Sequence, residues 1–232
     1  PTGHHVAAWR HPEAQADAGA NFSHYVQLAQ AAEAAKFDLI FMADGVGTRS
    51  DNHRYLSRTA HSYVAQFEPI TLLSALAAVT QRIGFVATAS TSFNEPFHIA
   101  RKFASLDNIS GGRAGWNLVT SSSEHEALNF NRERHFDHAE RYQRAAEFAQ
   151  VVTGLWDSWE DGALQRDKAS GLYFDPARRH VLNHKGRFFQ VKGPLNVPRS
   201  PQGHPVIVQA GSSPAGKALA AETAEVIFTA QQ

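Results

Sequence analysis

Cysteine is absent from the 232-residue chain, and no apolar run approaches the roughly 18–20 residues that cross a bilayer. Without cysteine the chain forms no disulfide, thiolate metal site or cysteine nucleophile, and a cytoplasmic location is favoured. Residues 1–10 have no signal-peptide pattern. We therefore expect no membrane segment.

Neither sign of charge is in excess, because 22 Lys and Arg residues balance 22 Asp and Glu residues. A nucleic-acid-binding protein needs an excess of cations, so we expect no nucleic-acid partner. The glycine signatures of dinucleotide and P-loop sites are missing, as are His-Glu-x-x-His and Gly-x-Ser-x-Gly. The spacing of the histidines does not match that of known metal-binding motifs. We therefore predict no metal site from His4, His5, His11 and His125.

Strand and helix patterns alternate along the chain, and hydrophobic residues make up 43% of it, enough for a substantial core. Short runs that are apolar on both faces are typical of buried parallel strands, and they predict strands over 37–43, 82–88, 113–120, 205–210 and 225–229. Amphipathic spacing, N-terminal prolines and a glycine stop predict helices over 21–36, 68–81, 94–112, 138–155 and 214–223. An α/β fold follows, either an eightfold barrel or an open doubly wound sheet.

The organisation of the chain has two irregular features. Residues 156–204 form a long excursion between a helix and a strand, and such excursions are usually lids or binding loops. A rigid surface elaboration at a subunit interface is the alternative. Because no strand precedes the first helix and five strands cannot close an eight-stranded barrel, we interpret the chain as a piece of a longer one.

Polar residues follow each predicted strand, where parallel α/β folds bind their ligands. They are Asp44, Thr88 to Thr91, Asn117, Thr120 to Ser122, Gln209 to Ser213 and Thr229. Each alone fits a helix cap or a turn equally well. Their occurrence at all five strand ends favours a binding face.

The segment 210–216 carries the strongest local signal. A strand ends there, a glycine permits a tight turn, Ser213 stands at a cap position and Pro214 at the first helical position. The N–H groups of the following helix would then bind an anion, although a capped helix without a ligand fits equally well. His138 and Tyr142 lie four residues apart on one helix face, which suits a phosphate, a polar ring or a simple packing pair.

Five stretches form a familiar set, namely 3–12 (GHHVAAWRHP), 37–45 (FDLIFMADG), 88–93 (TASTSF), 110–121 (SGGRAGWNLVTS) and 209–213 (QAGSS). On these residues the chain resembles the bacterial-luciferase-like flavin monooxygenases, in the branch of nitrilotriacetate monooxygenase component A, dibenzothiophene-sulfone monooxygenase and long-chain alkane monooxygenase. The likeness runs in order along nearly the whole chain. The block 110–121 is its most specific part.

The resemblance implies that 1–232 is a single incomplete TIM-barrel domain, a luciferase-like (β/α)8 barrel in which strand one and the last two barrel units are largely absent and the lid lies at about 156–204. It also implies a bacterial, two-component oxidoreductase that uses reduced FMN and O2. A separate NAD(P)H:flavin reductase would deliver the flavin, so NAD(P)H would act only through that partner. The enzyme would oxidise a small organic substrate by C–N or C–S cleavage or by carbon hydroxylation, and we expect a homo-oligomer. Carried over by position, the flavin contacts are Asp44, Thr88, Asn117, Thr120, His138, Tyr142, Ser212 and Ser213. His11, at the rim after strand one, would be the catalytic contact to the substrate or the activated oxygen.

Two alternatives stay open beside the monooxygenase. One is a flavin-binding luciferase-like protein without catalytic activity, since shortened barrels of this kind have a similar length. The other is a deazaflavin-dependent oxidoreductase on the same fold, which the identity of the cofactor would separate from the first two.

Overall fold

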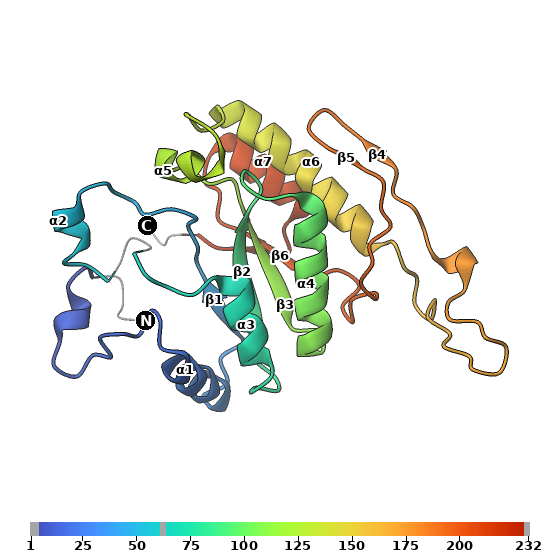
Figure 1. The fold of residues 1–232 in the computed structure, drawn as a ribbon, viewed down its shortest axis with the longest axis horizontal. Coiled ribbons are helices and arrows are strands. Elements are labelled where there is room, and N and C mark those ends of the chain that lie inside the picture. Colours follow the sequence, from blue (N-terminus) through green and yellow to red (C-terminus); the bar gives the residue numbers. More distant parts are fainter. Residues whose placement is uncertain (1–4, 61–63, 230–232) are drawn as a thin grey trace.

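A five-stranded parallel sheet forms the centre of the molecule (Figure 1). The structure is a computed structural model and describes residues 5–60 and 64–229. In spatial order the strands are β1 (Leu39–Met42), β2 (Gly84–Ser90), β3 (Ala114–Val119), β6 (Val206–Gln209) and β7 (Val226–Ile227). Each pair of neighbours is parallel, and the sheet is curled like part of a barrel. The strands therefore all present their carboxyl ends at one edge.

Helices connect the strands, as the alternating pattern predicts. They are α1 (Phe22–Ala34) before β1, then α3 (Pro69–Ala77), α4 (Pro96–Ser110), α6 (His138–Trp156) and α7 (Pro214–Thr223). Local chemistry sets their ends. The Glu68 carboxylate accepts the N–H groups of Ile70 and Thr71 at the start of α3. Gly111, with φ of +69°, ends α4 in a left-handed conformation that favours glycine.

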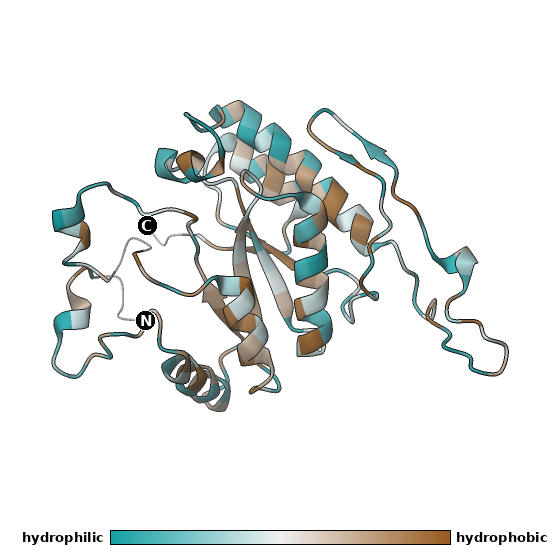
Figure 2. Cartoon of the chain, viewed as in Figure 1, coloured by the Kyte–Doolittle hydropathy of each residue, from teal (hydrophilic) through white to brown (hydrophobic). Residues whose placement is uncertain are grey.

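The core lies between the central strands and the helices that follow them. Trp116 on β3 is fully buried, and its ring lies within 6.4 Å of the rings of Phe103 on α4 and of Phe148 and Trp156 on α6, measured between centroids. Helices α4 and α6 each carry hydrophobic and hydrophilic residues side by side, as an amphipathic helix does (Figure 2). Because side chains alternate along a strand, Asn117 points to the opposite face from Trp116. The sheet thus has one face covered by helices and one face that carries polar side chains.

The outermost strands differ from the prediction that all five are buried on both faces. Val226 and Ile227 of β7 are exposed, and Leu39 of β1 is also open to solvent. Both strands lie at an edge of the sheet, so one side of each has no neighbouring strand in the described part of the chain. Burial on both faces holds for the inner strands β2 and β3.

Several short elements were not predicted, because a single turn or a two-residue strand has no period to detect. They are α2 (His53–Leu56), α5 (Glu124–Ala127), the 3-10 turns η1 (Ala8–Arg10), η2 (Leu128–Phe130) and η3 (Pro176–Arg178), and the strands β4 (His184–Lys185) and β5 (Gln190–Val191). Within residues 5–60 and 64–229, no helix is both long and apolar enough to cross a membrane.

The excursion 156–204 contains a small antiparallel hairpin, β4–β5, that lies along α6. Glu147 on α6 fastens it, because its carboxylate accepts the backbone N–H groups of Phe188 and Phe189 and contacts the imidazole of His184. The ring of Phe189 also packs edge-on against the ring of Phe148. The hairpin is therefore tied to one helix by both polar and apolar contacts.

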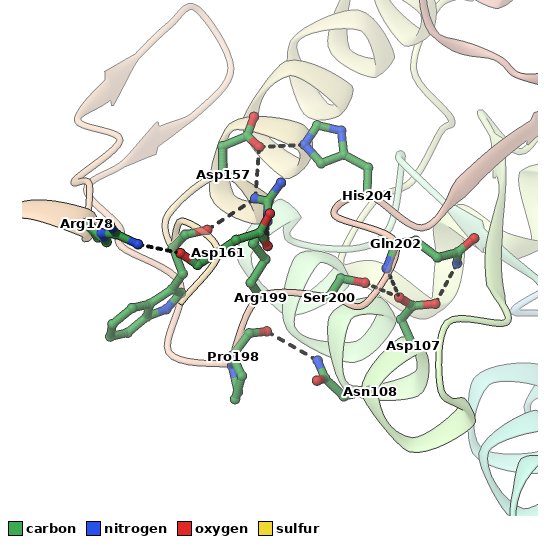
Figure 3. A network of polar contacts seen from close by, with 11 residues as sticks. Asp107, Asn108, Asp157, Asp161, Arg178, Pro198, Arg199, Ser200, Gln202 and His204 are labelled. Atoms are coloured by element: carbon green, nitrogen blue, oxygen red, sulfur yellow. Dashed lines mark hydrogen bonds and ion pairs between the residues drawn. The ribbon is translucent and has the colours of Figure 1, made fainter. Parts of the chain in front are cut away.

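The end of the excursion is held at the amino end of the sheet (Figure 3). The buried carboxylate of Asp107, near the end of α4, accepts the N–H of Ala114, the hydroxyl of Ser200 and both the backbone and side-chain N–H groups of Gln202. On the surface beside it, Asp157 pairs with Arg199 and His204. We call Asp107, Ala114, Ser200 and Gln202 the Asp107 clasp.

The predicted lid over the flavin stays a prediction, since the clasp fixes only the end of the excursion. A connection from a helix to the next parallel strand begins and ends at the amino end of the sheet, opposite the ligand-binding edge. Residues 156–204 follow that geometry, and in Figure 1 they extend beyond α6 in orange. None of the residues that line the cleft described below comes from this excursion.

Candidate functional site

A cleft of about 710 Å³ opens at the carboxyl ends of the strands. Asp44 follows β1, Thr88 comes from β2, Asn117 from β3 and Gln209 from β6, while Tyr142 of α6 closes one side. The predicted convergence of strand ends is therefore present in the fold. The cleft is also lined by the loop 119–123 that leaves β3.

Asn117 and Thr88 form the floor of the cleft. They are paired in register on neighbouring strands, so their side chains share the face opposite the helices. The Asn117 side-chain amide donates to the Thr88 hydroxyl over 2.8 Å, and its own oxygen is buried without a hydrogen-bond partner. A buried acceptor left unpaired costs about 1–3 kcal/mol. A ligand that presents an N–H or O–H at this point would remove that cost.

Ser213 is the N-cap of α7, and we call Ser213, Tyr142 and Gly216 the Ser213 cradle. Its hydroxyl oxygen accepts the N–H of Gly216 over 3.1 Å and lies 3.3 Å from the Tyr142 hydroxyl. Gly216 has no room for a side chain, because an added Cβ would stand 3.1 Å from that hydroxyl and 3.0 Å from the Cα of Gly211. Backbone N–H groups, two hydroxyls and the positive end of a ten-residue helix together suit a phosphate.

Ser213 itself, and His138 and Ser212 beside it, are not among the residues that line the cleft. His138 is exposed at the first position of α6, and its ring centre is 4.9 Å from that of Tyr142. Ser212 is exposed in the turn before α7. His138 shares the helix face of Tyr142 as predicted, so a phosphate at Ser213 would have both aromatic residues near it.

Asp44 has an unusual acidity for an aspartate. Burial raises its pKa to about 6, and the negative charges of Glu68 and Glu126 act in the same direction. Hydrogen bonds from the backbone of Gly45 and from the Gln66 side chain lower the pKa in part. The pKa of this carboxyl therefore lies closer to neutral than that of an ordinary aspartate, and shifted pKa values of this kind are common at functional sites.

Thr120 lies at the cleft where the chain leaves β3, and its carbonyl accepts the Ser92 hydroxyl over 2.5 Å. The next residue, Ser121, has a positive φ of 54° and joins its hydroxyl to that of Ser90 over 2.8 Å. These bonds hold the loop against the end of β2.

His11 is the one predicted site residue that lies well outside this group. It is exposed after η1, its Nδ1 accepts the N–H of Glu13, and it is not among the residues that line the cleft. Its predicted contact with a substrate stays a prediction.

Sequence reasoning missed Arg49 and Glu126, which both line the cleft. Arg49 lies in the polar loop after β1 and Glu126 in the single turn α5, and neither stretch has a periodic pattern. Arg141 was also missed. Its guanidinium donates to the Ser121 carbonyl, and its Nε is buried without a partner. Only the tertiary structure brings these three side chains to the strand ends.

Comparison with known proteins agrees with the sequence resemblance. A family model described as luciferase-like monooxygenase matches residues 2–232. The chain is 59% identical to N-acetyl-S-(2-succino)cysteine monooxygenase of Bacillus subtilis (strain 168), over 99% of this chain and 51% of that protein. It is 51% identical to nitrilotriacetate monooxygenase component A of Aminobacter aminovorans, over 100% of this chain and 52% of that protein.

A solved structure of riboflavin lyase with modified FMN and riboflavin is similar in fold, with a TM-score of 0.89 and 36% identity. The likeness covers 98% of this chain and 51% of that one. The chain thus spans about half the length of the relatives that it matches.

Proposed function

The chain belongs to the luciferase-like monooxygenase family, and from this premise we propose that it forms the FMN-binding part of a flavin-dependent monooxygenase. The enzyme would be the larger component of a two-component system, supplied with reduced FMN by an NAD(P)H:flavin reductase and using O2. The five strands would form part of an eight-stranded barrel. The observation that carries the proposal is the Ser213 cradle, which reaches the cleft through Tyr142, while the unpaired Asn117 oxygen lies in the same cleft.

The residues present fit FMN at both of its ends. Ser213, Tyr142 and the first turn of α7 would hold the phosphate, with His138 beside them. Asn117 would accept a hydrogen bond from the ring system, and Asp44 would lie at its edge. When bound and reduced, the flavin supplies the oxygen chemistry, while the protein orients it and keeps water away.

The substrate would be a small thioether or amine that carries carboxylates, as the names of the two relatives suggest for those proteins. N-acetyl-S-(2-succino)cysteine is the first compound to test, because the relative named for it is 59% identical to this chain over the 230 aligned residues. Arg49 at the cleft supplies a positive charge that suits a carboxylate.

The proposal is tested by titrating the protein with FMN, FAD, NAD and a deazaflavin, followed by oxygen consumption with a reductase and N-acetyl-S-(2-succino)cysteine. We expect FMN to bind most tightly and the substrate to increase product formation. Preference for a dinucleotide would contradict the proposal, and preference for the deazaflavin would favour the oxidoreductase alternative. Tight FMN binding without turnover on any substrate would favour a flavin-binding protein.

A further inference from the structure

Glu126 on α5 is buried at the edge of the cleft, with 7% of its surface exposed. It lines the main cleft and also a smaller cavity of about 100 Å³ that shares Asp44 and Thr88 with it. Its side chain therefore lies where the two spaces meet, among residues that would face a bound flavin or substrate.

Only one of its two carboxylate oxygens has a partner. Oε1 accepts the backbone N–H of Val46 over 3.2 Å, which ties α5 to the loop after β1. Oε2 is buried and has no hydrogen-bond partner. A buried carboxylate oxygen without a donor is costly, and the cost is greater for a charged group than for a neutral one.

Neighbouring acidic side chains make the unpaired carboxylate oxygen of Glu126 more unfavourable. Asp44 lines the same two spaces, and the charge of Glu126 is one cause of its raised pKa. Glu68 and Lys102 line the smaller cavity as well, but neither is a hydrogen-bond partner of Oε2. No group in the described chain donates a hydrogen bond to Oε2 of Glu126. A bound ligand is therefore the candidate donor.

Glu124, two residues earlier on the same turn, behaves differently. Its Oε2 accepts the backbone N–H of His135 over 2.8 Å, and it is not among the residues that line the cleft. One helical turn thus carries two acidic side chains. Glu124 is hydrogen-bonded to the fold, whereas Glu126 has one carboxylate oxygen bonded and one unpaired. Glu126 faces the cleft.

We propose that Glu126 is a specificity-determining residue of this site, whose Oε2 accepts a hydrogen bond from an N–H or O–H group of the bound molecule. The inference rests on the proposed function. The donor belongs either to the flavin or to the organic substrate, and both present such groups. Hydrogen bonds to a carboxylate are the stronger kind, so the contact favours donor-bearing molecules over isosteres without one.

The test compares Glu126→Gln with the control Glu124→Gln. Glutamine keeps an oxygen for the Val46 N–H but places an NH2 group where the unpaired acceptor stood. In Glu126→Gln we expect binding of the donor-bearing molecule to weaken about tenfold or more. A weaker FMN titration assigns the donor to the flavin. Unchanged FMN binding with weaker binding of N-acetyl-S-(2-succino)cysteine to the FMN-loaded protein assigns it to the substrate.

Thermal unfolding of the ligand-free protein gives a readout that needs no ligand. Because Glu126→Gln replaces a buried carboxylate oxygen that has no donor by a neutral amide group, we expect its Tm to equal or exceed that of the wild type, whereas Glu124→Gln should leave both ligand affinities unchanged. The inference is overturned if Glu126→Gln lowers the Tm, or if it binds both molecules as the wild type does. Failure of the wild type to bind FMN would contradict the proposed function itself, whereas wild-type FMN binding that Glu126→Gln retains, together with unchanged substrate binding, would contradict the role of Glu126 alone.

Discussion

The two ends of the sheet treat buried polar groups in opposite ways. At the amino end, the Asp107 clasp gives one buried carboxylate four donors from three other residues. At the carboxyl end, Asn117 and Glu126 each keep a buried oxygen without a partner. Buried polar atoms are normally satisfied, and those that are not call for an explanation. The clasp serves the fold, and we attribute the unpaired oxygens to a ligand.

The largest expected effect concerns the clasp. Asp107→Ala should lower the free energy of unfolding by about 3–5 kcal/mol, because several buried donors lose their acceptor at a cost of roughly 1–3 kcal/mol each. Urea denaturation followed by circular dichroism measures it. FMN affinity of the folded variant should stay unchanged, since the clasp lies at the opposite end of the strands from the cleft. A loss below about 1 kcal/mol would contradict this view of the clasp.

The cradle should show the reverse pattern. Ser213→Ala combined with His138→Ala should weaken FMN binding about 100-fold, or roughly 3 kcal/mol, because charge-assisted contacts to the phosphate are lost. The protein should stay folded, with about 1 kcal/mol lost from the N-cap of α7. Ser213→Gly is the control for the cap, because glycine there costs only a few tenths of a kcal/mol. FMN titration of the double variant that matches the wild type would place the phosphate elsewhere.

Asp44 adds a pH dependence to the cleft end. Its pKa is raised to about 6, first by burial and then by the charges of Glu68 and Glu126. The folded protein thus holds this proton more tightly than the unfolded chain, and the resulting stability is present below pH 3.8 and lost as pH rises through about 6.

Asp44→Asn should remove that loss. Above pH 6 its Tm should exceed that of the wild type by about 2–4 °C, the shift for ~1 kcal/mol in a protein of this size. The expected shift is small because the Asp44 side chain is partly open to solvent, which screens its charge. Thermal melts across the pH range decide the matter. A Tm difference that does not change with pH would show that Asp44 is not the titrating group.

The smallest effect should come from the surface beside the clasp. Asp157 pairs with Arg199 and His204, and 58% of its side chain is exposed. Exposed ion pairs contribute about 0–1 kcal/mol and are screened by salt. Asp157→Asn should therefore change stability by less than about 1 kcal/mol, and high salt should reduce the difference further. A larger effect that persists in salt would extend the clasp to Asp157.

Much of the fold could be predicted because its signals are local. Apolar runs predicted the strands of the sheet, and single residues such as Glu68, Gly111 and Ser213 mark helix ends by their own hydrogen bonds or φ angles. The excursion 156–204 was placed over the cleft because its length suggests a lid. A helix-to-strand connection in a parallel sheet begins and ends at the amino end, and no residue of 156–204 lines the cleft, so the lid stays a prediction.

The candidate site was predictable in part for the same reason. Asp44, Thr88 and Asn117 follow or end apolar runs, so their place at the carboxyl edge is a consequence of the parallel order. The bond between Asn117 and Thr88 depends on the register of two strands, which no local pattern contains. Glu126 and Arg49 lie on a short turn and a loop whose paths are set by contacts with distant residues.

The amino-acid sequence by itself determined the alternation of strands and helices, the polar residues at the strand ends and the cap of α7. These features follow from hydrophobic periodicity and from hydrogen bonds between residues close in the chain. Only the tertiary structure decided which buried oxygens are paired. Whether an acceptor such as that of Asp107 or Glu126 finds a donor depends on segments far apart in the sequence, and burial in the folded state is what makes a missing donor costly.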